Sequence, residues 1–110
     1  MRDEPLSIED LGEQNNRRVL KLSGPLTIAT LFEFQTLVRT NSSAGLVLDF
    51  TRVPYVDSAG VGALVGAYVR HQKAGHSVVL AGVNDRVRGT LKVTQVDSFF
   101  KYVEGLPQSA

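Results

Sequence analysis

The sequence predicts an α/β domain in which a small mixed β-sheet carries helices mainly on one face. Two short, continuous aliphatic runs, GLVLDF at residues 45–50 and SVVLAG at residues 77–82, are typical of parallel strands covered on both faces. The stretch between them has a helical pattern of about the length that a parallel crossover needs, which predicts a right-handed βαβ unit. Alternating apolar and polar residues ahead of this unit predict two further strands.

The two predicted N-terminal strands contain LSIED and RRVLKLSG and are joined by a turn through residues 12–16. Leu20 and Leu22 share one face of the second strand, as expected for a half-buried strand with a period of two. Pro25 ends this strand, because proline has no N–H to donate to a strand ladder.

Two more helices are expected outside the βαβ unit. The first runs from Thr27, its N-cap, to Thr40, because apolar residues recur there near helical spacing. These apolar residues are Ile28, Leu31, Phe32, Leu37 and Val38. The other helix is capped by Asn84, has an acidic first turn, and turns Val87 and Leu91 inward. Residues 98–105 then form either a last strand or a short amphipathic segment.

Composition favours one soluble domain over residues 1–110, with frayed ends at about 1–5 and 105–110. The sequence has twelve basic and eleven acidic residues and thus no excess of positive charge, so direct nucleic-acid binding is not expected. The absence of cysteine excludes disulfides, zinc-thiolate sites and thiol catalysis. The charged N-terminus is no signal peptide, and the longest uncharged stretch, 58–69, is too short to span a membrane. We therefore expect a cytoplasmic protein without membrane insertion.

The stretch VPYVDSAGVGALVGAYV, residues 53–69, contains the main candidate site. Ser58 follows a buried strand and begins a helix that extends to Ala74. Free backbone N–H groups and the helix dipole favour an anion at such a position. The alternative is that Asp57, Ser58 or both simply cap the helix.

The residues around Ser58 do not fit an enzyme. A nucleophile elbow needs Gly-x-Ser-x-Gly, and Val56 occupies the first glycine position. A serine nucleophile also needs a base, but His71 is roughly 20 Å away along the helix and His76 lies beyond the helix end. Both histidines are interpreted as solvated. Val65 breaks the dinucleotide glycine pattern and no phosphate-loop Gly-Lys-Ser/Thr occurs, so no cofactor is expected.

A helical wheel of this helix predicts an apolar inner stripe and an outer face of small residues. The inner stripe consists of Val61, Leu64, Val65, Tyr68, Val69 and Gln72. The outer face consists of Ala59, Ala63, Gly66 and Arg70, flanked by Gly62 and Ala67. No charge precedes Arg70, where a solvated helix would carry several. The face is therefore either a docking surface for a partner or buried within the domain.

Three segments resemble one known family. LVLDFTRVPYVDSAGVGALV, residues 46–65, resembles the central signature of STAS domains, which are named for sulphate transporters and anti-sigma factor antagonists. GPLTIAT, residues 24–30, resembles the family's Gly-x-Leu-Asp-x-x-Thr segment, with Thr27 in place of the usual Asp. Residues 80–100 resemble its strand and third-helix region. The resemblance covers nearly the whole chain and implies a single STAS-like domain.

The resemblance implies a bacterial, non-enzymatic regulator of transcription, an anti-sigma factor antagonist that acts by partner switching. Its partners would be an anti-sigma factor that is also a serine kinase and a PP2C-type phosphatase, with a weak homodimer as a further expectation. Ser58 matches the phosphorylated serine. The expected partner-binding residues are Thr27, Asp57, Ser58, Ala59, Gly62, Ala63, Gly66 and Arg70. The alternative is a STAS subunit of a membrane transport complex for lipids or anions, in which Ser58 is only a cap.

Overall fold

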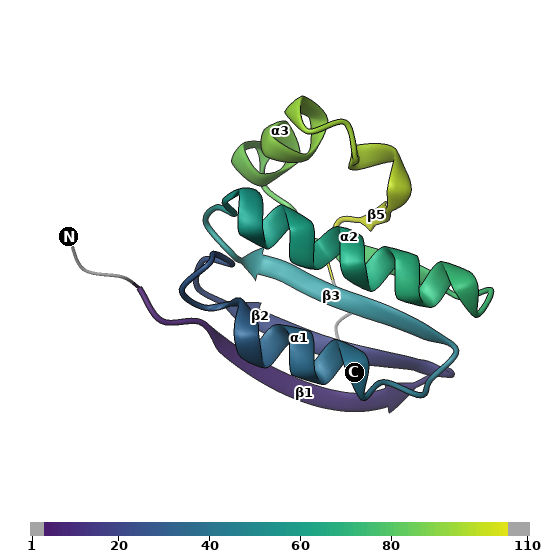
Figure 1. The fold of residues 1–110 in the computed structure, drawn as a ribbon. Coiled ribbons are helices and arrows are strands. Elements are labelled where there is room, and N and C mark those ends of the chain that lie inside the picture. Colours follow the sequence, from purple (N-terminus) through teal and green to yellow (C-terminus); the bar gives the residue numbers. More distant parts are fainter. Residues whose placement is uncertain (1–3, 106–110) are drawn as a thin grey trace.

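The computed structural model describes residues 4–105 and contains one five-stranded sheet with the strand order β1-β2-β3-β4-β5 (Figure 1). β1 is antiparallel to β2, and the remaining pairs are parallel. The elements are β1 (Ser7–Gln14), β2 (Arg17–Ser23), α1 (Leu31–Arg39), β3 (Gly45–Arg52), α2 (Ser58–Lys73), β4 (Ser77–Ala81), α3 (Asp85–Val93), the 3₁₀ helix η1 (Asp97–Phe99) and β5 (Lys101–Val103). The predicted mixed sheet and its central βαβ unit are confirmed.

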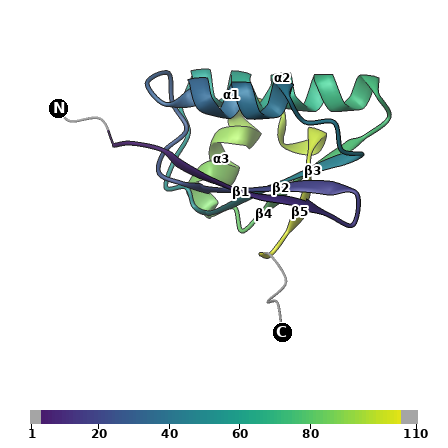
Figure 2. The same ribbon diagram turned by 90° about the horizontal axis from the view of Figure 1, so that it is seen from below.

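The helices lie on one side of the sheet, with α1 and α2 next to each other in a layer above it (Figure 2). The main core fills the space between sheet and helices and includes Phe34 of α1, Leu48 and Phe50 of β3, and Leu64 of α2, all fully buried. The fold class is therefore as predicted.

The expectation that the parallel strands are covered on both faces is wrong. Val19, Val47 and Val79 form a separate cluster on three neighbouring strands, with Leu11 packed against it. No helix of the described chain covers the face of the sheet opposite α1 and α2 (Figure 2). The valines are nevertheless buried, and they pack with one another and with Leu11. A run of aliphatic residues does not distinguish this kind of burial from cover by a helix.

The turn between β1 and β2 is shorter than predicted. It consists of Asn15 and Asn16, whose φ angles of 55° and 67° lie in the left-handed region that asparagine tolerates. Gly12, expected in the turn, lies within β1 with a φ of 78°, where the register shifts at a β-bulge. A bulge glycine and a turn glycine have the same appearance in a sequence.

The first helix starts later than predicted. Its N-cap is Thr30, and Thr27 lies in a preceding turn whose carbonyl accepts the N–H groups of Thr30 and Leu31, both at 3.0 Å. Ile28 and Phe32, two of the apolar residues on which the predicted helix was based, are 74% and 77% exposed, and Ile28 lies outside the helix. The cause is that residues 25–30 are held against the loop before α2, as described below.

The C-terminal third follows the prediction more closely. The Asn84 side chain caps α3 by accepting the N–H of Val87 at 2.8 Å, and Val87 and Leu91 are fully buried. Of the two alternatives for residues 98–105, the last strand is confirmed, because β5, a three-residue strand parallel to β4, follows η1.

Candidate functional site

Asp57 caps α2 and also holds the loop before α1. One carboxylate oxygen accepts the N–H of Gly60 at 2.8 Å and the other accepts the N–H of Ile28 at 3.1 Å. The cap of α2 is therefore Asp57 and not Ser58. Ser58 is the first residue of the helix and is exposed, and its hydroxyl forms no hydrogen bond with the described part of the chain.

The two loops touch through their backbones. Leu26 and Val56 form a parallel bridge, in which Leu26 donates to the carbonyl of Tyr55 and Asp57 donates to the carbonyl of Leu26, both at 3.3 Å. Gly60 lies so close to this bridge that an added Cβ would be 2.1 Å from the Leu26 carbonyl oxygen. Only glycine fits at position 60, which places the segment with Ile28 directly beside the start of α2.

Thr27 organises this segment from within. Its N–H donates to the Thr30 hydroxyl at 2.9 Å, and its own hydroxyl accepts the N–H of Ala29 at 3.2 Å. The Thr30 hydroxyl also donates to the carbonyl of Pro25 at 2.8 Å. Thr27 is half-buried, so its contribution to the site is the shape of the loop.

The exposed face of α2 differs in part from the wheel prediction. Ala63 is only 7% exposed and Ala59 is half-buried, whereas Val69 is 40% exposed. The prediction that Ala63 faces outward is wrong, as is the inward placement of Val69 and Gln72. The reason is that α1 packs beside α2 and covers the flank with the alanines, so the buried face is rotated toward α1. We give the name α2 strip to four exposed residues of the helix, Ser58, Gly62, Gly66 and Val69. Beyond the strip, Arg70, Gln72 and Lys73 are also exposed.

The α2 strip is open. A Cβ added to Gly62 or Gly66 would meet no atom within 4 Å. At its N-terminal end the strip lies next to the segment that carries Ile28 and Phe32, two exposed apolar side chains. These two residues were missed as surface residues, because their i, i+4 spacing is also that of a buried helix face.

The C-terminal end of α2 is fixed by polar contacts. Arg70 is exposed, and its guanidinium donates to the carbonyl of Arg39, the last residue of α1, at 2.5 Å. His71 is 3% exposed, with Nδ1 2.9 Å from the Ala67 carbonyl oxygen and Nε2 2.8 Å from the Asn41 amide nitrogen. The interpretation of His71 as a solvated residue is therefore wrong. It is one of the contacts that fix the α1–β3 loop to α2.

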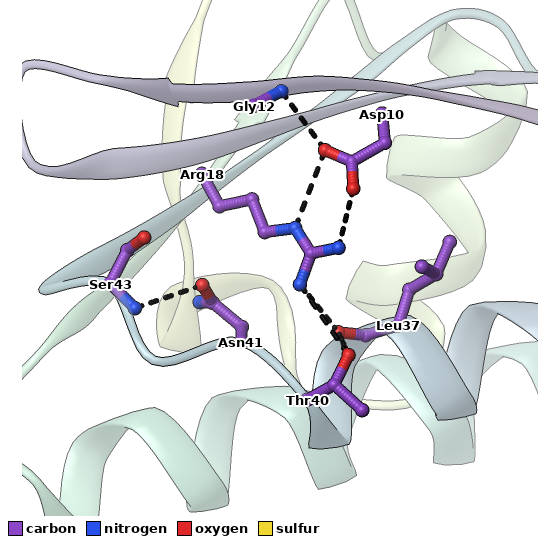
Figure 3. Close-up of polar contacts among 7 residues, drawn as sticks. All are labelled: Asp10, Gly12, Arg18, Leu37, Thr40, Asn41 and Ser43. Atoms are coloured by element: carbon purple, nitrogen blue, oxygen red, sulfur yellow. Dashed lines mark hydrogen bonds and ion pairs between the residues drawn. The ribbon is translucent and has the colours of Figure 1, made fainter.

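A second polar group holds the sheet against the end of α1 (Figure 3). Arg18 of β2 forms an ion pair with Asp10 of β1 and also donates to the carbonyl of Leu37 at 3.3 Å. The Arg18 hydrogen bond, followed by that from the Gly12 N–H, holds the pKa of Asp10 below its ordinary value.

Between Glu4 and Gly105 the structure shows neither a group of metal ligands nor a membrane-spanning helix. No three His, Asp or Glu side chains in this range are grouped to hold a metal ion. None of its helices combines the length and the apolarity needed to cross a bilayer.

The STAS domain family model matches residues 10–107 of the chain. The fold is similar to an anti-sigma factor antagonist from Mycobacterium paratuberculosis, at 18% identity and a TM-score of 0.79 over 92% of this chain and 87% of that chain. It is similar to a sulfate transporter family protein from Wolinella succinogenes, at 19% identity and a TM-score of 0.76 over 84% and 80%. It is also similar to the Bacillus cell fate determinant SpoIIAA in its phosphorylated form, at 16% identity and a TM-score of 0.68 over 90% and 91%.

Proposed function

The chain belongs to the STAS domain family, and from this premise we propose that it is an anti-sigma factor antagonist that acts by partner switching. In the unphosphorylated form it binds an anti-sigma factor that is also a serine kinase, and the sigma factor is released. Phosphorylation of Ser58 abolishes this binding, and a PP2C-type phosphatase restores it. The observation that carries the proposal is the exposed Ser58 hydroxyl at the start of a helix whose exposed side is open and uncharged from Ser58 to Val69.

The α2 strip suits close contact with a partner. Gly62 and Gly66 have no side chains to hold the partner away, so its backbone or large side chains can approach the helix directly. Ile28, whose N–H binds Asp57, and Phe32 at the start of α1 supply exposed apolar surface, and aromatic residues buried at an interface contribute strongly to affinity. Ala63 is excluded from the proposed contact because it is buried, and Ala59 can contribute only its exposed edge.

A phosphate on Ser58 affects the complex far more than the fold. It adds about 1.5 to 2 negative charges at a helix N-terminus, where the dipole and the free N–H groups favour an anion. Asp57 stays bound to Gly60 and Ile28, so the loop that presents Ile28 has its own support. In the complex the same charge would be removed from water beside the Asp57 carboxylate, at a cost of several kcal/mol. The partner therefore dissociates while the domain stays folded.

A second candidate function has one observation in its favour, the similarity to the sulfate transporter family protein from Wolinella succinogenes. In this case the chain would be a subunit of a lipid or anion transport complex. The α2 strip would dock on another subunit of that complex, and Ser58 would serve only as the first residue of the helix.

Phosphorylation with candidate kinases tests the proposal. The full chain and its Ser58→Ala, Ser42→Ala and Ser43→Ala variants are incubated with ATP and serine kinases from the same genome, and phosphopeptides are identified by mass spectrometry. We expect one kinase to modify every protein except Ser58→Ala. Equal labelling of Ser58→Ala would contradict the assignment. Failure of all kinases, together with co-purification of transporter subunits, would favour the second candidate.

A further inference from the structure

A cleft of about 810 Å³ lies at the C-terminal end of α2, between the helix and the α1–β3 loop. The helix side is lined by Gly66, Val69, Arg70 and Lys73, and the loop side includes Ser42 and Ser43. Gly66 and Val69 also belong to the α2 strip, so the cleft and the strip form one continuous surface. A partner that covers the strip therefore reaches the cleft.

The cleft is cationic. Arg70 and Lys73 are exposed, no Asp or Glu lines the cleft, and α2 has no acidic residue along its length. Two carbonyls of the last turn of α2 already have partners, because those of His71 and Gln72 accept the N–H groups of His76 and Gly75 at 2.8 Å and 2.9 Å. Two positive charges are thus left without a carboxylate among the residues that line the cleft.

Acidic residues do occur on the other side of the α1–β3 loop, namely Asp10 and Glu13. The Asp10 carboxylate is bound by Arg18, and the pair is held by the end of α1 (Figure 3). Asp10 is thus unavailable to the cations of the cleft, and Glu13 is exposed on the far side of the loop. Neither of these two carboxylates therefore forms an ion pair with Arg70 or Lys73.

The walls of the cleft are fixed in the free protein. The Asn41 amide oxygen accepts the N–H of Ser43 at 3.0 Å, and the amide nitrogen contacts His71 and donates to the carbonyl of Gly45 at 3.3 Å. The bond from Arg70 to Arg39 sets the direction of the guanidinium. Asn41 and Arg70 therefore need little further ordering when a ligand binds here, which favours affinity.

We propose that the partner's contact surface includes an acidic segment that binds in this cleft through Arg70 and Lys73. The inference rests on the proposed function and names the chemistry of the partner. At 1.5 Å per residue, Lys73 is about 22 Å along the helix from Ser58. The acidic segment therefore lies about 22 Å from the part of the partner that contacts Ser58. One end of α2 binds this segment, and the other end repels the partner once Ser58 is phosphorylated, so the two ends together fix the partner's orientation.

Association kinetics with the kinase that modifies Ser58 test the inference, using the unphosphorylated full chain. Lys73→Glu should lower the association rate on the order of tenfold, since charges at an interface rim act mainly on association. It should also weaken the salt dependence of that rate. The matched control is Lys92→Glu, because Lys92 is likewise an exposed lysine in the last turn of a helix, here α3. This control should associate as the wild type does.

Carbodiimide cross-linking of the same complex identifies the acidic segment, because the reagent joins a lysine amine to a carboxylate in direct contact. We expect a cross-link from Lys73 to an Asp or Glu of the kinase and none from Lys92. If Ser58→Asp loses binding while Lys73→Glu associates normally and the wild type gives no cross-link from Lys73, the cleft proposal is overturned and the switch stands. If Ser58→Asp binds as well as the wild type, the proposed function itself fails.

Discussion

Three glycines of α2 have different surroundings and therefore different roles. Gly60 lies against the backbone of Leu26, and any side chain at this position would collide with a carbonyl group. Gly62 and Gly66 face open space, so no contact within the domain requires a glycine there. In a helix interior each glycine costs up to about 1 kcal/mol relative to alanine. At Gly62 and Gly66 no contact within the domain explains this cost. Glycine at these positions agrees with a helix surface that a partner approaches closely.

Alanine substitutions at positions 60 and 66 should therefore have opposite effects on stability. Gly60→Ala should lower the free energy of unfolding by about 1 to 3 kcal/mol, since the Leu26 carbonyl cannot rotate away as a side chain can. Gly66→Ala should raise it by up to about 1 kcal/mol. Urea unfolding followed by circular dichroism measures both values. Equal stability of the two variants would mean that the backbone around Gly60 can accommodate a Cβ.

Individual residues differ in how far the sequence predicts them. The capping role of Asp57 was one of the predicted alternatives, because Asp before a helical run is a local signal. The second bond of Asp57, to Ile28, joins residues far apart in the chain and has no local signal. The burial of His71 likewise depends on Asn41, thirty residues away.

The helix α2 has neighbours on both flanks, which leaves only a narrow exposed strip. α1 packs along one flank, and on the other the Tyr68 ring stacks on Phe99 of η1 with ring centroids 4.6 Å apart. The wheel placed Ala63 outside because small residues on a helix can face either solvent or a closely packed helix. Only the position of α1 decides between these, and that position depends on the whole sheet.

Substitution of Gly66 by arginine tests whether the α2 strip is a docking surface. Gly66→Arg should fold with a melting temperature at or above that of the wild type, since position 66 is open. Binding to the anti-sigma partner should fall by a factor that corresponds to several kcal/mol, because a charge would enter a desolvated contact. Calorimetric titration measures this loss.

Gly66→Ala serves as the control and should bind nearly as the wild type does. An unfolded Gly66→Arg protein would mean that the outer side of α2 is buried inside the domain. A folded variant with normal binding would move the contact surface to the loop around Thr27.

At the scale of the whole molecule, the sequence predicted that β3 and β4 are parallel neighbours and that the helices lie mainly on one face, but it also predicted cover on both faces of the parallel strands. Short aliphatic runs separated by a helix-length segment specify neighbouring parallel strands, because right-handed crossovers leave few alternatives. The cluster of Val19, Val47 and Val79 shows the limit of that reasoning. Burial by neighbouring strands and burial by a helix select the same residue types.

The Asp10–Arg18 pair connects the edge of the sheet to the end of α1, and it makes stability depend on pH. Because the pKa of Asp10 is lowered in the folded protein, the pair stabilises the fold above the ordinary pKa of aspartate, about 4. This contribution disappears as the pH falls through the lowered folded pKa. The pair is partly solvent-exposed, so its contribution is no more than about 1 kcal/mol.

We therefore expect wild type to be more stable than Asp10→Asn at pH 6 and the difference to shrink toward pH 3. Urea unfolding of both proteins at a series of pH values measures this trend. A difference that stays constant across the series would mean that the Asp10 carboxylate has no special interaction in the folded state.

Both edges of the sheet are poor templates for an additional strand. The outer edge of β1 is interrupted by the bulge at Gly12 and carries the charges of Glu9 and Glu13, and β5 at the other edge is only three residues long. Bulges, charges and short edge strands are the features by which natural sheets avoid edge-to-edge aggregation. Pairing of the domain with a second copy through its edge strands is therefore disfavoured. Under the proposed function, association takes place on the helical side instead, and a single phosphate on Ser58 would control it.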